Sequence, residues 1–229
     1  MIRTPFFTVN PKSYLYGQEL MDLAYKADEL AEKYEVDIFF TAPLIELSEI
    51  IRNTKHIIPT AQHMDHIEPG TGMGHVSPDI LAAKGVKATF LNHAEHPVEM
   101  SKLVKTIKRA QELNIITLVC ADSVDEAKAL TLLDPDIMLC EPTELIGTGQ
   151  TSDDDYVKET NDAVRSVNPD VFVLQAAGIS NANDVTRALK LGADGTGGTS
   201  GIVKAKDPQK ALEAMIEALV AVREEKEEK

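Results

Sequence analysis

The chain has 229 residues, of which 43% are hydrophobic and 26% are charged. This balance is typical of an ordinary globular protein and excludes a disordered or fibrous one. The formal net charge of −14 disfavours nucleic acid and anionic membranes as partners, because both are polyanions. The length falls within the range of one α/β unit, so we expect a single domain covering residues 1–229.

No segment has the composition of a membrane anchor. The long apolar run at residues 211–222 is interrupted by Glu213 and Glu217, whereas a spanning helix needs about 20 apolar residues. Residues 1–5 lack the apolar stretch of a secretory signal. We therefore expect a cytoplasmic protein without a membrane partner.

Short runs rich in Val, Ile, Leu and Phe predict eight strands, separated by stretches of helical periodicity. The expected strands are residues 6–9, 36–41, 57–61, 88–92, 115–120, 137–140 and 171–175, with a weak eighth near residues 193–198. Because the strands are apolar throughout, each is expected to be buried on both faces of a parallel sheet with right-handed crossovers. A closed (β/α)8 barrel and an open doubly wound sheet both satisfy this pattern.

Several helix starts are marked by capping residues. Ser77 and Asp207 are each followed by proline, and Ser123 with Glu126 forms a capping box. Asn181 is a further cap. A helical face is expected at Met21, Ala24, Tyr25, Ala27 and Leu30.

We expect no metal and no cofactor. The two cysteines, Cys120 and Cys140, are embedded in apolar runs and are best interpreted as buried free thiols. Three successive acids at residues 153–155 could ligate a metal. Acids at a helix start more often complement the helix dipole, and we favour that interpretation.

In a parallel barrel, catalytic residues lie where strands end and the following loops begin. This rule selects Asn10 and Lys12, then residues 92–95, 141–149, 177–180 and 199–201. Enolisation of a ketose phosphate needs a carboxylate that takes a proton from carbon, donors to the developing oxyanion, and a cation and amides for the phosphate. A lone histidine, lysine or Gly-Thr-Gly turn is more often structural, but together at successive strand ends they favour this chemistry.

At these positions the chain resembles the triosephosphate isomerase family. Asn10-Pro11-Lys12 resembles its Asn-x-Lys motif, and Ala61-Gln62 with residues 70–74 resembles its third loop. Residues 140–149 resemble its catalytic glutamate and mobile lid. The short length, the Glu-Leu-Ile-Gly of the lid and residues 203–208 are most similar to the compact archaeal branch.

The resemblance implies interconversion of dihydroxyacetone phosphate and D-glyceraldehyde 3-phosphate, with a small phosphorylated sugar as the ligand. Glu141 would be the base, His93 the electrophile, kept neutral in this family by a helix N-terminus, and Lys12 the cation at the anionic intermediate. Asn10 and Glu95 would be supporting residues of the site. Residues 142–149 would close over the substrate and exclude water. The implied phosphate-binding residues are Gly147, Ala177, Gly178, Thr199 and Ser200. The family also implies a homodimer or a homotetramer.

Some positions depart from the family pattern. Ala94 and His96 stand where the family has serine and arginine. The family's arginine commonly pairs with an acid of the third loop, and His75 stands at the position of that acid. The arginine and its acidic partner have therefore both been replaced. Met73 replaces a third-loop threonine that reaches a neighbouring subunit, and Ala176 replaces a small turn residue.

The eighth strand reads Gly-Thr-Gly-Gly and is poorly suited to an apolar barrel, so the lost side-chain volume must be refilled or become pocket. Three hypotheses about the function stay open: a triosephosphate isomerase, a related aldose–ketose isomerase for another small phosphosugar, and a non-catalytic homologue.

Overall fold

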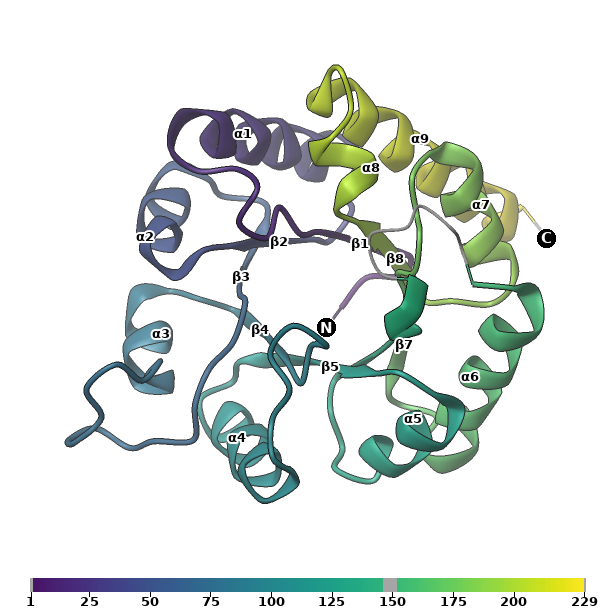
Figure 1. The fold of residues 1–229 in the computed structure, drawn as a ribbon. Coiled ribbons are helices and arrows are strands. Elements are labelled where there is room, and N and C mark those ends of the chain that lie inside the picture. The colour runs from purple at the N-terminus through teal and green to yellow at the C-terminus, as the bar shows by residue number, and fades with distance from the viewer. Residues whose placement is uncertain (1, 146–151, 229) are drawn as a thin grey trace.

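Eight parallel strands close into a barrel surrounded by helices (Figure 1). The computed structural model describes residues 2–145 and 152–228. The strands are β1 (Phe6–Val9), β2 (Ile38–Ala42), β3 (Ile58–Ala61), β4 (Ala88–Leu91), β5 (Ile116–Ala121), β6 (Ile137–Cys140), β7 (Phe172–Gln175) and β8 (Gly195–Gly198). Phe7 of β1 is in register with Ile38 of β2 and with Thr196 of β8, which closes the ring. The (β/α)8 expectation is confirmed, and the open sheet is excluded.

A helix follows each strand and covers the outside of the barrel. The helices are α1 (Gly17–Tyr34), α2 (Leu44–Asn53), α3 (Pro78–Lys84), α4 (Met100–Glu112), α5 (Val124–Thr131), α6 (Asp154–Val167), α7 (Ala182–Lys190), α8 (Ser200–Val203) and α9 (Pro208–Glu227), with a 3₁₀ turn, η1 (Thr143–Leu145), after β6. The short α8 and η1 carry no periodic signal and were not expected. Within the described ranges, no helix is both long and apolar enough to cross a bilayer.

The capping residues act as expected. Side chains of Ser77, Ser123, Asn181 and Asp207 each accept a hydrogen bond from a first-turn amide. Asp153 does the same at α6 by accepting from the amide of Tyr156 at 2.7 Å, so the helix-start interpretation of residues 153–155 is confirmed.

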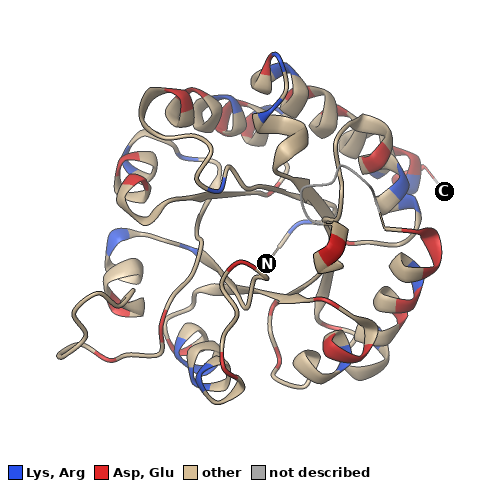
Figure 2. Cartoon of the chain, in the orientation of Figure 1, with Lys and Arg blue, Asp and Glu red and all other residues tan. Residues whose placement is uncertain are grey.

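Two apolar layers hold the barrel, one inside the ring of strands and one between the strands and helices. Cys120 lies in the inner layer and Cys140 in the outer one, and both are buried free thiols. The expected face of α1 is buried except at Tyr25, where that expectation was wrong because the ring lies toward solvent and is 46% exposed. Charged residues of both signs lie mainly on the outer helices and loops (Figure 2).

The glycines of β8 face bulky side chains of β1. A Cβ atom added at Gly195 would lie 2.3 Å from the ring of Phe6, and one at Gly197 would lie 1.9 Å from Oγ1 of Thr8. Phe6 also packs edge-on against Phe39 and Phe172, with ring centroids 5.5 and 6.2 Å away. The volume missing from β8 is therefore refilled from β1 at these two levels, which is why a glycine-rich segment forms a barrel strand.

Candidate active site

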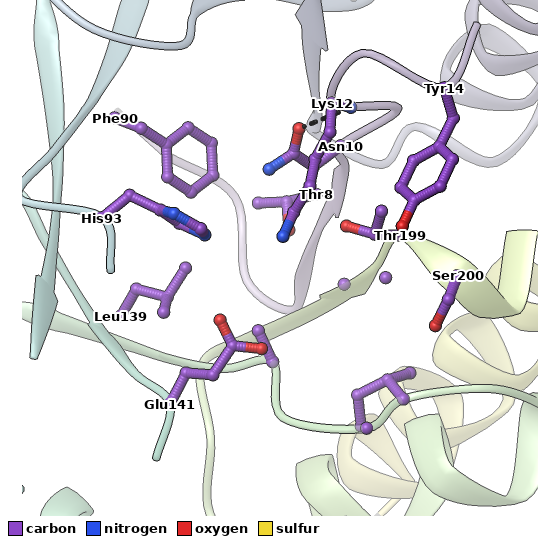
Figure 3. A pocket seen from close by; sticks show the side chains of 15 residues that line it. Thr8, Asn10, Lys12, Tyr14, Phe90, His93, Leu139, Glu141, Thr199 and Ser200 are labelled. Atoms are coloured by element: carbon purple, nitrogen blue, oxygen red, sulfur yellow. Dashed lines mark hydrogen bonds between the residues drawn. The ribbon is translucent and has the colours of Figure 1, made fainter. Parts of the chain in front are cut away.

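A pocket opens at the carboxyl ends of the strands and is lined by residues of β1, β4, β6 and β8 and of the segments that follow β1, β4, β6, β7 and β8 (Figure 3). The predicted site residues that line it are Asn10, Lys12, His93, Glu141, Gly178, Thr199 and Ser200. Segments far apart in the sequence thus meet because every parallel strand ends on the same face of the barrel.

Glu141 follows β6 directly, and its amide donates to the carbonyl of Ala121 at 3.0 Å, which continues the pairing with β5. Its carboxylate is directed into the pocket, on the side that His93 faces (Figure 3). Burial raises the pKa of Glu141 to about 7, with nearby Lys12 opposing the rise and Glu95 adding to it. A carboxyl group with a pKa near neutrality exchanges protons readily at physiological pH, which suits a general base.

His93 lies in a tight turn after β4. The turn begins at Asn92, whose φ of 57° is left-handed and whose side chain donates to the carbonyl of Cys120 and accepts from the amide of Val98, both at 3.1 Å. The amide of Glu95 donates to Nδ1 of His93 at 3.1 Å. Burial, followed by the charge of Lys12, lowers the pKa of His93. The ring is therefore neutral at pH 7 and carries its proton on Nε2.

The donor to His93 differs from the one that the resemblance implies. The Glu95 amide belongs to the turn itself, whereas α4 begins only at Met100. In the described structure, a turn amide performs the task expected of a helix N-terminus.

Lys12 is held by three polar contacts. Its backbone has a left-handed φ of 48°, its amide donates to Oδ1 of Asn10 at 3.0 Å, and its carbonyl accepts from Nε2 of Gln62 at 2.9 Å. The ammonium group pairs with Glu95 at 2.7 Å. Non-glycine residues adopt such a backbone only where their surroundings impose it. Gln62 thus helps to position Lys12. In the sequence, the only sign of this was that Ala61-Gln62 resembles the third loop of the family.

Glu95 lies beside the main pocket rather than in its lining. With Lys12, His93 and His96 it lines an adjoining cavity of about 230 Å³. Pairing with Lys12 lowers the pKa of Glu95 and keeps it ionised. The supporting role of Glu95 stays a prediction.

The end of the pocket that the resemblance assigns to phosphate is lined by Gly178, Thr199 and Ser200, together with Ala176. Gly178 has a left-handed φ of 68°, and no Cβ fits at Gly201 because it would meet the backbone of Ser180 at 2.5 Å. Ala177 is buried and does not line the pocket. Gly147, with the rest of residues 146–149 of the expected lid, lies outside the described residues.

The two histidines that depart from the family pattern have separate partners. The ring of His96 stacks on that of His63, with centroids 4.1 Å apart and planes inclined by 40°. His75 pairs instead with Asp65 at 3.1 Å, and Asp65 also accepts from the amide of Val76 at 2.7 Å. A stacked ring pair therefore links the loops after β3 and β4.

Comparison with known proteins identifies the family. The sequence model described as triosephosphate isomerase matches residues 5–219. The chain belongs to the triosephosphate isomerase family. Triosephosphate isomerase of Methanothermus fervidus is 36% identical over 93% of this chain and 97% of its own, and that of Methanocaldococcus jannaschii is 35% identical over 91% and 97%. The enzyme of Sulfolobus acidocaldarius is 29% identical over 99% and 100%.

These relatives confirm the resemblance to the archaeal branch of the triosephosphate isomerase family. Membership implies an isomerase whose substrate is a phosphorylated sugar. Among the described residues, no group of three or more His, Cys, Asp or Glu side chains is arranged to hold a metal ion.

Proposed function

We propose that this chain interconverts dihydroxyacetone phosphate and D-glyceraldehyde 3-phosphate without metal or cofactor, and that residues 1–229 form one domain. The observation that carries the proposal is that Glu141, with a pKa near 7, shares one pocket with a neutral His93. A carboxylate base and a neutral hydrogen-bond donor are the two groups that enolisation next to a carbonyl requires.

In this mechanism the Glu141 carboxylate removes a proton from the hydroxymethyl carbon of dihydroxyacetone phosphate. The electron pair of the broken C–H bond forms the enediolate, whose developing oxyanion accepts a hydrogen bond from Nε2–H of His93. Lys12 stabilises the added negative charge. A proton also moves from the hydroxyl oxygen of the first carbon to the oxygen of the neighbouring carbon: His93 gives its Nε2 proton to the second oxygen and takes a proton from the first. Protonated Glu141 then returns its proton to the neighbouring carbon and the aldehyde forms at the first carbon, so both Glu141 and His93 are regenerated in each turnover.

The phosphate is assigned to the turns at Gly178 and at Thr199–Ser200, with Ala177 and Gly147 as further predicted contributors. The small, left-handed turn at Gly178 supports this, because it leaves the backbone open to a ligand. Residues 142–149 are proposed to cover the bound substrate and keep water from the enediolate.

The related isomerase with another phosphosugar is the weaker candidate. This alternative was suggested by the side-chain volume missing from β8. Phe6 and Thr8 occupy the space beside Gly195 and Gly197, so that volume does not enlarge the pocket at these two positions. The assembled set of Glu141, His93 and Lys12 argues against the non-catalytic alternative. Carboxyl groups with a strongly raised pKa are concentrated at functional sites of proteins.

A coupled assay with purified protein tests the proposed reaction. We expect turnover of glyceraldehyde 3-phosphate by the wild type and strong losses in Glu141→Asp and His93→Gln. Tetrose and pentose phosphates should react more slowly than the triose pair. Folded wild-type protein without turnover would refute the proposed function, and near wild-type rates in both variants would refute the assigned roles.

We further propose a cytoplasmic homodimer or homotetramer. Support comes from the loop that carries Met73, which is fully exposed, and from the cavity beside Lys12 and Glu95. An exposed apolar tip and a cavity at the site together suit contact between subunits. Sedimentation analysis would give two or four chain masses, whereas a monomer at micromolar concentration would contradict the proposal.

A further inference from the structure

Tyr14 belongs to the pocket but has no part in the mechanism above. It follows Lys12 in the loop after β1 and lines the pocket together with Thr199 and Ser200. Figure 3 shows its ring reaching from that loop with the hydroxyl end directed toward Thr199 and Ser200. The phenol therefore lies at the end of the pocket assigned to phosphate, across from Glu141 and His93.

One contact fixes the backbone at Tyr14 and another fixes its ring. The amide of Tyr14 donates to the carbonyl of Pro11 at 3.0 Å, which folds the loop back on itself. The ammonium group of Lys204, just after α8, lies 5.3 Å from the ring centroid. A cation over an aromatic face is attracted by the ring's negative face. The contact links the loop after β1 to the end of α8.

The side chain of Tyr14 is accessible to a ligand. It is 51% exposed and lines the pocket. Lys12 is the one cation among the described residues that line this pocket, so a dianion bound there needs further donors. A phenol donates well to an ionised oxygen, and such charge-assisted hydrogen bonds are stronger than neutral ones.

We propose that Tyr14 is a substrate-binding residue that donates its hydroxyl hydrogen bond to the phosphate group, and that Lys204 positions its ring. The inference rests on the proposed function for the identity of the substrate. The binding of phosphate itself does not depend on turnover, so the two claims can be tested apart.

The test compares Tyr14→Phe with a matched control, Tyr16→Phe. Tyr16 lies two residues away, is 75% exposed and does not line the pocket. Both variants keep the aromatic ring, and Tyr14→Phe keeps the surface that Lys204 covers. Calorimetry measures the binding of inorganic phosphate to wild type and both variants, and steady-state kinetics compares glyceraldehyde 3-phosphate with unphosphorylated glyceraldehyde.

We expect Tyr14→Phe to weaken phosphate binding and to raise KM for glyceraldehyde 3-phosphate by about three- to tenfold. Its kcat/KM for glyceraldehyde should equal that of the wild type, and Tyr16→Phe should change neither quantity. Lys204→Met should weaken phosphate binding in the wild type more than in the Tyr14→Phe background, because it acts partly through the ring.

Several results would overturn the inference. Phosphate binding within twofold of wild type in Tyr14→Phe would do so, as would equal losses with both aldehydes or a change in oligomeric mass that accompanies the loss. If the wild type binds phosphate in a Tyr14-dependent way without turnover, the proposed function fails and the assignment of Tyr14 is upheld.

Discussion

The amide of Glu95 donates to Nδ1 of His93, and the carboxylate of the same Glu95 accepts from Lys12. One residue therefore sets the tautomer of the imidazole with its backbone and the position of the cation with its side chain. The turn after β4 fixes both groups that meet the substrate's oxygen in the proposed mechanism. The left-handed conformation of Asn92 at the start of the turn makes this arrangement possible.

Replacing His93 with glutamine should remove a donor to the oxyanion while leaving a similar volume. We expect kcat to fall by about 100- to 1,000-fold, because preorganised donors act mainly on the transition state. KM should change little, and the melting temperature should stay close to that of the wild type. The measurement is steady-state kinetics with thermal unfolding as the control, and a loss confined to KM would contradict the assigned role.

Activity should depend on the ionisation of Glu141. Because burial raises its pKa to about 7, kcat/KM should fall about tenfold per pH unit well below that value as the base becomes protonated. The substrate phosphate titrates near pH 6, as phosphate monoesters do. A pH profile with a midpoint near 7 supports Glu141 as the titrating group, whereas a midpoint of 6 or lower would indicate that only the substrate titrates.

The same raised pKa predicts a stability effect. A carboxyl group whose pKa rises on folding stabilises the fold below its unfolded pKa of about 4.5, and this stabilisation is lost as the pH rises through about 7. Glu141→Gln should therefore exceed the wild type in free energy of unfolding by about 1–3 kcal/mol at pH 8.5. The gain should shrink at pH 5.5.

Urea unfolding at both pH values measures this difference. Glu68→Gln, which changes an exposed carboxylate, serves as the control and should show no comparable gain. Equal stability of Glu141→Gln and the wild type at pH 8.5 would mean that the Glu141 charge is well solvated in the folded protein.

Gly195 should tolerate a methyl group only if Phe6 becomes smaller. A Cβ there would meet the Phe6 ring at 2.3 Å, so Gly195→Ala should destabilise the protein by about 1–3 kcal/mol through overpacking. Phe6→Leu should also destabilise it, by opening a cavity. The double variant should be more stable than the sum of the two effects predicts, as measured by chemical denaturation, whereas strict additivity would show that the two positions do not share this volume.

The stacked His63–His96 pair predicts a weakness in acid. Burial and the neighbouring His96 lower the pKa of His63, against the opposing influence of Asp65. A base whose pKa falls on folding stabilises the fold above its unfolded pKa of about 6.5, and this stabilisation is lost as the pH falls through the folded pKa. The free energy of unfolding should thus decline below pH 6.5.

His63→Asn should reduce that decline, because it removes the imidazole whose protonated form is disfavoured chiefly by burial. His56→Asn, at a histidine whose ring pairs with the exposed Glu32, is the matched control. Identical pH dependence of stability in His63→Asn and the wild type would exclude His63 as a source of the acid sensitivity.

Local patterns in the sequence predicted most of the fold. Apolar runs identified the strands, capping residues identified helix starts, and the strand-end rule with the family resemblance selected Asn10, Lys12, His93 and Glu141. These features could be predicted because each depends on residues close together in the chain.

The features that were missed depend on contacts between distant segments. β8 looks unfit for a barrel until Phe6 and Thr8 of β1 are placed against its glycines. The stacking of His96 on His63 and the Gln62 contact to Lys12 likewise join separate loops. No local pattern reports such packing, because it is set by the closure of the ring.

Hydrogen exchange at carbon tests the central claim most directly. Dihydroxyacetone phosphate is incubated with the wild type in heavy water and followed by proton NMR, with Glu141→Gln as the comparison. The account predicts that the wild type incorporates deuterium at the hydroxymethyl carbon and that the variant, although folded and able to bind phosphate, slows this exchange by at least about 1,000-fold. Exchange at an undiminished rate in Glu141→Gln, or none in folded, phosphate-binding wild type, would contradict it.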